Sequence, residues 1–122
     1  MSKTLNLFFV GDIVGQPGLE LAINLVPNYV KKYNVDFLII NGENTTEGKG
    51  IAEEHAKKIF ELGTHVITTG NHVWDRWDSR KVLGADRRIL RPLNYPRENG
   101  GNGYIVVDLG EKGKVGVLNV QG

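Results

Sequence analysis

Three short apolar runs alternate with two segments of helical periodicity, and this order limits the possible folds more than any other feature of the chain. The runs are Leu5–Val10, Phe37–Asn41 and His65–Thr69, and the helical segments lie near Leu19–Tyr33 and Ile51–Leu62. A β-α-β-α-β order predicts parallel strands joined by right-handed crossovers. The nearly continuous apolar character of the first run predicts a strand that is buried on both faces.

Two residues bear on where the helices run. Pro27 lies inside the first helical segment. Proline lacks a backbone N–H and its ring clashes with the preceding turn, so we expect a kink there or two abutting shorter helices. Gly63 follows the second segment and is expected to cap its C-terminus.

The C-terminal part of the chain changes character. Prolines in the stretch "RILRPLNYP" favour an irregular or edge-like segment. Tyr104–Asp108 and Val115–Val120 flank a turn rich in glycine and lysine, which predicts a β-hairpin. With 122 residues, of which 40% are hydrophobic and 24% charged, the chain is expected to form about one soluble domain. The predicted fold class is α/β, a mainly parallel sheet with a C-terminal hairpin.

Composition excludes several classes of function. The formal net charge of +1 makes general nucleic-acid binding unlikely, and the basic stretch Arg76–Arg91 is interpreted as a solvated surface. The absence of cysteine excludes disulfides, thiolate catalysis and cysteine-based zinc sites. The apolar run Leu5–Val10 is too short to span a bilayer and lacks the cleavage region of a signal peptide. We therefore expect a cytoplasmic protein with no membrane partner.

Polar side chains follow each of the three apolar runs, directly after a glycine. These residues are Asp12 after the first run, Glu43 and Asn44 after the second, and Asn71 and His72 after the third. Parallel strands place their carboxyl ends at one edge of the sheet, where α/β proteins bind ligands. Two carboxylates at one edge repel each other unless a cation lies between them. Each glycine-polar pair taken alone also fits ordinary turn chemistry.

The motifs "GDIVG", "NGEN", "GNH.WD" and "RP.N.P", in this order and spacing, resemble the YmdB-like branch of the calcineurin-type metallophosphoesterases. The resemblance covers essentially the whole chain. It implies that residues 1–122 are the N-terminal part of such a domain, half of a four-layer αββα sandwich whose C-terminal half is absent. It also implies a phosphodiesterase that hydrolyses cyclic nucleotides such as 2′,3′-cyclic AMP with two metal ions, which Fe, Mn, Mg or Zn could supply.

The resemblance assigns a role to each residue at the strand ends. Asp12 would bind the first metal, Glu43 would bridge both metals, and Asn44 would add an oxygen ligand. Asn71 would bind the second metal. His72 would stay off the metals and protonate the leaving oxygen, because imidazole can donate a proton near neutral pH.

Two further residues match the motif "RP.N.P". Arg91 and Asn94 are expected to contact the phosphate or ribose of a small-molecule phosphodiester substrate. The sequence leaves open whether the protein forms a homo-oligomer.

The sequence departs from the wider superfamily in two places, both typical of this branch. Val14 stands where the superfamily has the histidine of Asp-x-His, and Glu43 stands where it has aspartate. The remaining ligands of the family are three histidines from the second half of the fold. Because His55 and His65 are interpreted as structural residues, the chain alone is expected to bind metal weakly and to turn over poorly.

Two alternatives compete with this reading. A Rossmann-like nucleotide-binding module would use the glycines that follow the first strand and Glu43 after the second. The glycine spacing is G-x-x-x-G-x-x-G, however, which is not the G-x-G-x-x-G fingerprint. The other alternative is a non-catalytic regulatory fragment that keeps the fold without a complete set of ligands.

Overall fold

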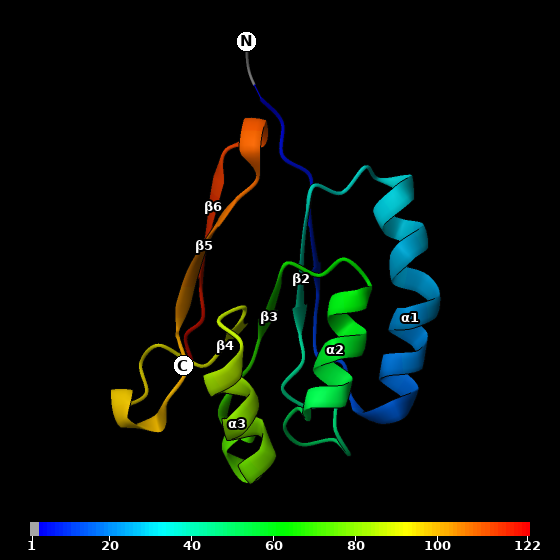
Figure 1. Cartoon of the computed structure of the whole chain (residues 1–122). Helices are drawn as coiled ribbons and strands as arrows, with labels where there is room; N and C mark the ends of the chain where they lie inside the picture. The colour runs from blue at the N-terminus through cyan, green and yellow to red at the C-terminus, as the bar shows by residue number, and fades with distance from the viewer. Residues whose placement is uncertain (1–2) are drawn as a thin grey trace.

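Four parallel strands form the central layer of the fold, with helices on one face and a β-hairpin on the other (Figure 1). The computed structural model describes residues 3–122. The central strands are β1 (Leu7–Val10), β2 (Phe37–Asn41), β3 (Val66–Thr68) and β4 (Ile89–Leu90). The helices are α1 (Gly15–Lys32), α2 (Glu53–Glu61) and α3 (Trp77–Ala85). The hairpin consists of β5 (Tyr104–Asp108) and β6 (Lys114–Leu118), and short 3-10 helices are η1 (Asn71–Asp75), η2 (Arg97–Asn99) and η3 (Gly110–Lys112).

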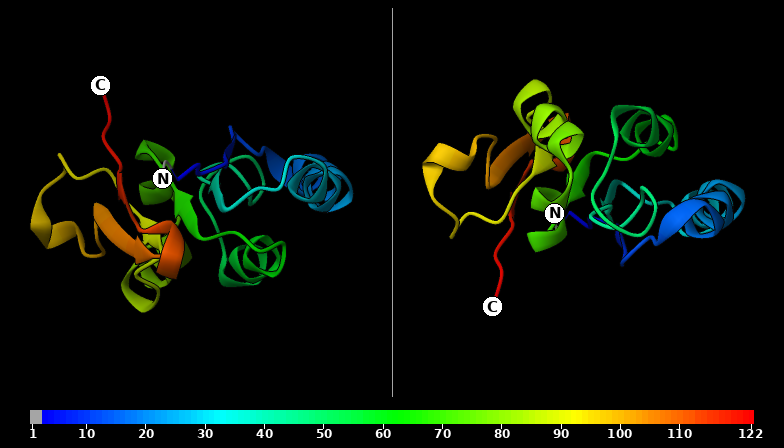
Figure 2. Two further views of the ribbon diagram at one scale, coloured as in Figure 1. Left: turned by 90° about the horizontal axis from the view of Figure 1, so that it is seen from above. Right: turned by 90° about the horizontal axis from the view of Figure 1, so that it is seen from below.

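The sheet order is β1-β2-β3-β4, and every pair within it is parallel. Views from above and below show the helices on one side of the sheet and the hairpin on the other (Figure 2). The predicted α/β class is confirmed, with a mainly parallel sheet and an antiparallel C-terminal hairpin. The layers follow the order helices, sheet, hairpin.

Side chains of the strands contribute to two separate cores, because successive side chains of a strand point to opposite faces of the sheet. On the helical side, Leu38, Ile40 and Ile67 pack with the buried faces of the three helices. On the hairpin side, Phe37 and Ile39 form a second cluster that includes Val117 of β6. The two cores lie on opposite faces of the sheet. The carboxyl edge of the sheet lies outside both cores and carries polar residues.

The prediction that the first strand is buried on both faces is wrong. Leu7 and Phe9 are 51% and 53% exposed, whereas Phe8 and Val10 pack against the helical core. The strand lies at the edge of the sheet, and the core under the hairpin is built from residues of β2, β3, β4 and the hairpin itself. Because β1 is the edge strand and the hairpin packs on its neighbours, the face of β1 that carries Leu7 and Phe9 is left uncovered.

Pro27 does not divide the first helix, so the alternative of two abutting helices is wrong. Helix α1 runs without a break from Gly15 to Lys32, and it begins four residues before the predicted start at Leu19. Pro27 lies on the exposed face. The carbonyl that loses its partner to Pro27 belongs to Ile23, which is also exposed and so can be hydrated.

The cap of the second helix is confirmed. Gly63 adopts a φ of +93°, a left-handed conformation that glycine tolerates without strain. Its N–H donates to the carbonyl of Phe60 at 3.0 Å. Among residues 3–122, no helix is long and apolar enough to cross a membrane.

His65 links β2 to β3 through its imidazole ring. Nδ1 accepts the backbone N–H of Leu38 at 3.1 Å, and the ring stacks on Phe37 with 4.8 Å between centroids. A nitrogen that accepts a hydrogen bond must be unprotonated, so this contact requires the neutral ring. Burial lowers the pKa of His65 below its ordinary value of 6.5.

The protein is expected to lose stability as pH falls below about 6.5, in part through His65. Because the pKa of His65 is lower in the folded than in the unfolded chain, its contribution is present above the unfolded pKa and is lost as pH falls through the folded value. Urea unfolding at pH 7.5 and pH 5.0 measures the loss. His65→Asn keeps an acceptor near Nδ1 but does not titrate, so its loss should be smaller by about 1 kcal/mol. Equal losses in both proteins would contradict this role.

Candidate metal centre

The loops beyond β1, β2 and β3 stay in register because the backbone pairing continues past the strands. The N–H of Gly15 donates to the carbonyl of Asn44 at 3.0 Å, and Val14 forms a parallel bridge with Asn44. The N–H of Gly42 donates to the carbonyl of Thr68 at 2.9 Å. These bonds hold the three polar loops side by side at the carboxyl edge.

A continuous hydrogen-bonded path joins side chains from all three loops. The Nδ2 of Asn44 donates to Oδ1 of Asp12 at 2.7 Å. Nδ1 of His72 lies 2.6 Å from Oδ1 of Asn44, and it also lies 3.9 Å from Oε2 of Glu43. The structure therefore brings Asp12, Glu43, Asn44 and His72 into one cluster.

The path fixes which nitrogen of His72 carries its proton. With the amide nitrogen of Asn44 turned to Asp12, the amide oxygen of Asn44 can only accept. Nδ1 of His72 must therefore donate, and the neutral ring carries its proton there. Nε2 is left free to accept a proton from solvent and to pass it to a reacting group.

Asp12 is held in an unusual backbone conformation. Its φ is +33°, a region that residues other than glycine rarely occupy, although aspartate tolerates it better than most. Such strain persists only where the surroundings impose it, and it is concentrated at functional sites. The carboxylate stays exposed, with the amide of Asn44 as its hydrogen-bond donor.

Glu43 carries an orphaned carboxylate oxygen. Its Oε2 is buried and has no hydrogen-bond partner among residues 3–122. Gly70 makes room for this carboxylate, because a Cβ on Gly70 would overlap Oε2 and lie 2.7 Å from the carboxyl carbon. A buried carboxylate oxygen without a donor is costly, and a cation would satisfy it.

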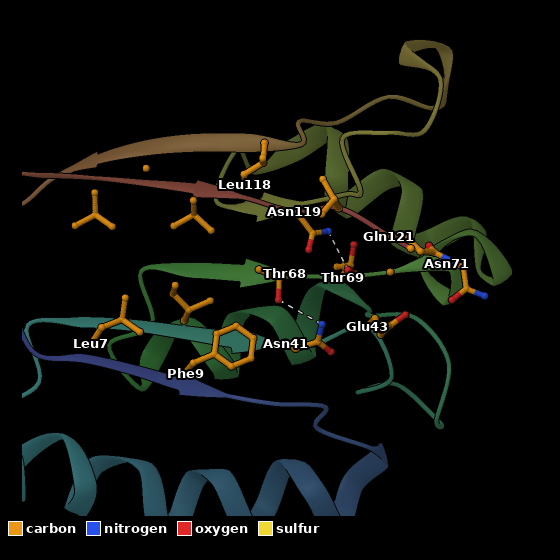
Figure 3. Close-up of a pocket in the computed structure, with 17 residues that line it drawn as sticks. Leu7, Phe9, Asn41, Glu43, Thr68, Thr69, Asn71, Leu118, Asn119 and Gln121 are labelled. Atoms are coloured by element: carbon orange, nitrogen blue, oxygen red, sulfur yellow. Dashed lines mark hydrogen bonds between the residues drawn. The ribbon is translucent and has the colours of Figure 1, made fainter.

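Asn71 lies at the same end of an open groove as Glu43 (Figure 3). The groove runs between the sheet and the hairpin and has a volume of about 680 Å³. Leu7 and Phe9 line its other end (Figure 3). The exposed side chain of Asn71 therefore has access to the space in front of Glu43.

These residues fit hard cations by their chemistry. The donor set offers carboxylate oxygens from Asp12 and Glu43 and amide oxygens from Asn44 and Asn71. Across the described part of the chain, no three side chains of Asp, Glu, His or Cys converge on one point. A metal here would therefore depend on the amide oxygens, and the roles given to the individual residues stay predictions.

Arg91 and Asn94 form hydrogen bonds with the backbone of the loops that follow β4 and of the C-terminal segment. The guanidinium of Arg91 is buried and donates to the carbonyls of Gly100 at 2.6 Å and Pro92 at 2.9 Å. Asn94 pairs with the backbone of Gln121 through bonds of 2.6 and 3.1 Å. In this arrangement both side chains hold loops in place, and substrate contact by either stays a prediction.

His55 lies away from the cluster. Its Nδ1 is 2.7 Å from Oγ1 of Thr46, within the loop that precedes α2. His65 bonds to the start of β2, at the opposite end of that strand from Glu43. The structure brings neither ring to the cluster.

Gly70 and Asn41 are the residues of the site that the sequence argument misses. A glycine at position 70 suits the turn after β3, and its φ of −152° lies outside the left-handed region that favours glycine. Its importance comes from its closeness to Glu43, which lies 27 positions earlier and which no local pattern reveals. The amide oxygen of Asn41 is buried without a partner among residues 3–122, and Asn41 lines the groove with Glu43 (Figure 3).

The structure does not support the Rossmann-like alternative. Dinucleotide-binding sheets reverse their strand order, and the ligand lies in the crevice at the point of reversal. Here the order β1-β2-β3-β4 runs in one direction, so the described sheet has no such crevice.

Several known proteins are similar to this chain in sequence or in fold. The 2′,3′-cyclic-nucleotide 2′-phosphodiesterase of Bacillus subtilis is 36% identical over 118 residues, which cover 97% of this chain. A crystal structure of a novel phosphatase from Mycoplasma pneumoniae has a TM-score of 0.90 at 32% identity and covers all of the chain. A crystal structure of a hypothetical protein from Thermus thermophilus has a TM-score of 0.85 at 30% identity and covers 95%.

The chain spans 44% of the length of each of these proteins. It therefore matches about half of the phosphatase structure from Mycoplasma pneumoniae, with the parallel sheet and the hairpin both included in the match. The family described as YmdB-like protein matches residues 8–122. Because this match covers nearly the whole chain, the protein belongs to the YmdB-like family.

Proposed function

We propose that this chain is the N-terminal part of a metal-dependent phosphodiesterase that hydrolyses cyclic nucleotides such as 2′,3′-cyclic AMP. The observation that carries the proposal is the path from Asp12 through Asn44 to His72, with the orphaned oxygen of Glu43 beside it. The name of the relative from Bacillus subtilis supports the choice of substrate.

Four residues would hold two cations. Asp12 and Glu43 would supply negative charge, and the carboxylate of Glu43 would offer two oxygens. Asn44 and Asn71 add neutral oxygens, which limits the crowding of negative charge. Two bound cations would neutralise charge on the phosphate and lower the pKa of a water molecule, which would lose a proton to solvent and attack the phosphorus.

His72 would supply the proton that the leaving group needs. As a P–O bond to one ribose oxygen breaks, that oxygen gains negative charge and must be protonated. The bond from Nδ1 to Asn44 orients the ring and leaves Nε2 to carry the transferred proton when the ring is charged. Asn44 would therefore orient both Asp12 and His72, in addition to offering its amide oxygen to a cation.

Metal analysis combined with a hydrolysis assay tests the proposal on the protein at its natural length. The wild type should take up two equivalents of Mn²⁺ or Fe and convert 2′,3′-cyclic AMP to a monophosphate. Asp12→Asn keeps an oxygen but loses the charge, so its metal affinity should fall at least about tenfold. Asp108→Asn, a change in the hairpin that preserves the acceptor for the N–H of Gly110, should behave like the wild type.

Failure to take up metal would favour the regulatory-fragment alternative. Metal uptake with no dependence on Asp12 would show that the cluster described above is not the site. Neither result is expected, because the strained backbone of Asp12 and the orphaned oxygen of Glu43 occur at the same edge of the sheet.

A further inference from the structure

The loop that carries Glu43 and Asn44 contains three residues with a positive φ. Residues 42–52 connect β2 to α2, and within them Glu47, Gly48 and Gly50 have φ values of +53°, +80° and +73°. Glycine adopts a positive φ without strain, so Glu47 is the one of these three residues for which the conformation is unfavourable. Hydrogen bonds and packing contacts hold the loop in this conformation.

Two buried hydroxyls accept consecutive backbone N–H groups at the end of this loop. Oγ of Ser79, on α3, accepts the N–H of Ile51 at 2.8 Å. Oγ1 of Thr46 accepts the N–H of Ala52 at 2.8 Å and lies 2.7 Å from Nδ1 of His55. Ser79 and Thr46 are 0% and 4% exposed, so water cannot replace either bond. We call Thr46 and Ser79 the hydroxyl pair.

The loop also packs closely on the segment that contains Ser79. A Cβ on Gly50 would lie 2.5 Å from Oγ of Ser79 and 3.0 Å from Cδ of Arg76. Arg76 binds Asp78 through two bonds of 2.9 Å and reaches Glu47 of the loop at 3.2 Å. The hydrogen bond to Asp78 raises the pKa of Arg76 and lowers that of Asp78, so both remain charged.

These contacts join the two segments that supply the candidate site. The loop begins with Glu43 and Asn44, and η1, which starts at Asn71 and includes His72, leads directly into α3. Helices α2 and α3 lie side by side (Figure 1). The bond from Ser79 to the N–H of Ile51 therefore ties the end of this loop to the helix that follows His72, although Ser79 contacts neither His72 nor Asn44 in the bonds described.

We propose that the hydroxyl pair acts as a set of positioning residues for the reaction, an inference that rests on the proposed function. Thr46 closes the loop on itself, and Ser79 ties the closed loop to the segment that carries His72. Support of this kind matters because small displacements of ligands and proton donors lower turnover strongly. Neither residue is catalytic, since neither touches the cluster of Asp12, Glu43 and His72.

Four variants of the protein at its natural length test the inference. Ser79→Ala and Thr46→Val remove a hydroxyl each, and Thr46→Ser retains it. Thr64→Val is the matched control, because it removes a buried hydroxyl that donates to the carbonyl of Ile59 at 2.7 Å, far from the cluster. The measurements are the melting temperature, the Mn²⁺ affinity by calorimetry, and kcat and KM with 2′,3′-cyclic AMP.

All three hydroxyl losses should lower the melting temperature by similar amounts. Only Ser79→Ala and Thr46→Val should weaken Mn²⁺ binding and reduce kcat, each by about tenfold, with KM within about twofold of the wild type. Thr46→Ser should restore both quantities. If Ser79→Ala does not fold, the comparison of Thr46→Val with Thr46→Ser decides the question.

Two outcomes separate this inference from the proposed function. If the wild type binds Mn²⁺ and hydrolyses the substrate, but the hydroxyl variants match Thr64→Val, the positioning role is overturned and the proposed function stands. If the wild type neither binds metal nor hydrolyses the substrate, the proposed function fails and the positioning role fails with it.

Discussion

Gly70→Ala is expected to lower phosphodiester hydrolysis about a hundredfold or more and to weaken metal binding in parallel. The added Cβ would overlap Oε2 of Glu43 and lie 2.7 Å from its carboxyl carbon, so the carboxylate must move. The φ of Gly70 is −152°, which lies outside the left-handed region that favours glycine. The substitution therefore displaces one candidate ligand and leaves every candidate side chain in the protein. Calorimetric titration with Mn²⁺ and a hydrolysis assay measure the effect.

Gly84→Ala is the control for this experiment. Gly84 lies in α3, where a Cβ would meet no atom within 4 Å, and alanine is the better helix former. This variant should keep full activity and be as stable as the wild type or slightly more stable. Wild-type metal affinity in Gly70→Ala would contradict the role of Glu43 as a ligand.

Much of the fold can be predicted from the sequence because its signals are local. Apolar runs and helical periodicity place β2, β3, α1 and α2 to within about four residues. The left-handed conformation of Gly63 follows from its position after a helix. Alternation of strands and helices also predicts that the strands are parallel.

The sequence does not predict features that depend on which elements lie next to each strand or helix. The apolar run of β1 does not reveal that this strand lies at the edge of the sheet, with Leu7 and Phe9 uncovered. Pro27 lies on an exposed face of α1, where water can hydrate the carbonyl of Ile23, and the helix continues through it. Sheet order and helix orientation decide both outcomes, and neither is encoded in a short window of sequence.

The candidate site also has some features that the sequence predicts and others that it does not. Topology alone brings the loops of Asp12, Glu43 and Asn44 together, because parallel strands in register end at one edge. The orientation of the Asn44 amide depends on side-chain contacts between three loops. For this reason the sequence alone does not indicate which nitrogen of His72 carries the proton.

His72→Asn is expected to reduce kcat by about 10²- to 10⁴-fold for a substrate with a poor leaving group. Asparagine places an N–H donor near the position of Nδ1, so the bond to Oδ1 of Asn44 can be kept. The variant lacks any atom that corresponds to Nε2 and cannot donate a proton there. Metal content should therefore stay at the wild-type level, because His72 is proposed to act on the leaving oxygen and not as a ligand.

The dependence on leaving group separates proton donation from a structural effect. A 4-nitrophenyl phosphodiester releases a stable phenolate that needs little protonation, so His72→Asn should lose far less activity with it than with 2′,3′-cyclic AMP. A displaced site would instead lower both activities equally, as Gly70→Ala is expected to do. Equal losses in His72→Asn, or a loss of bound metal, would show that His72 supports the cluster and does not donate the proton.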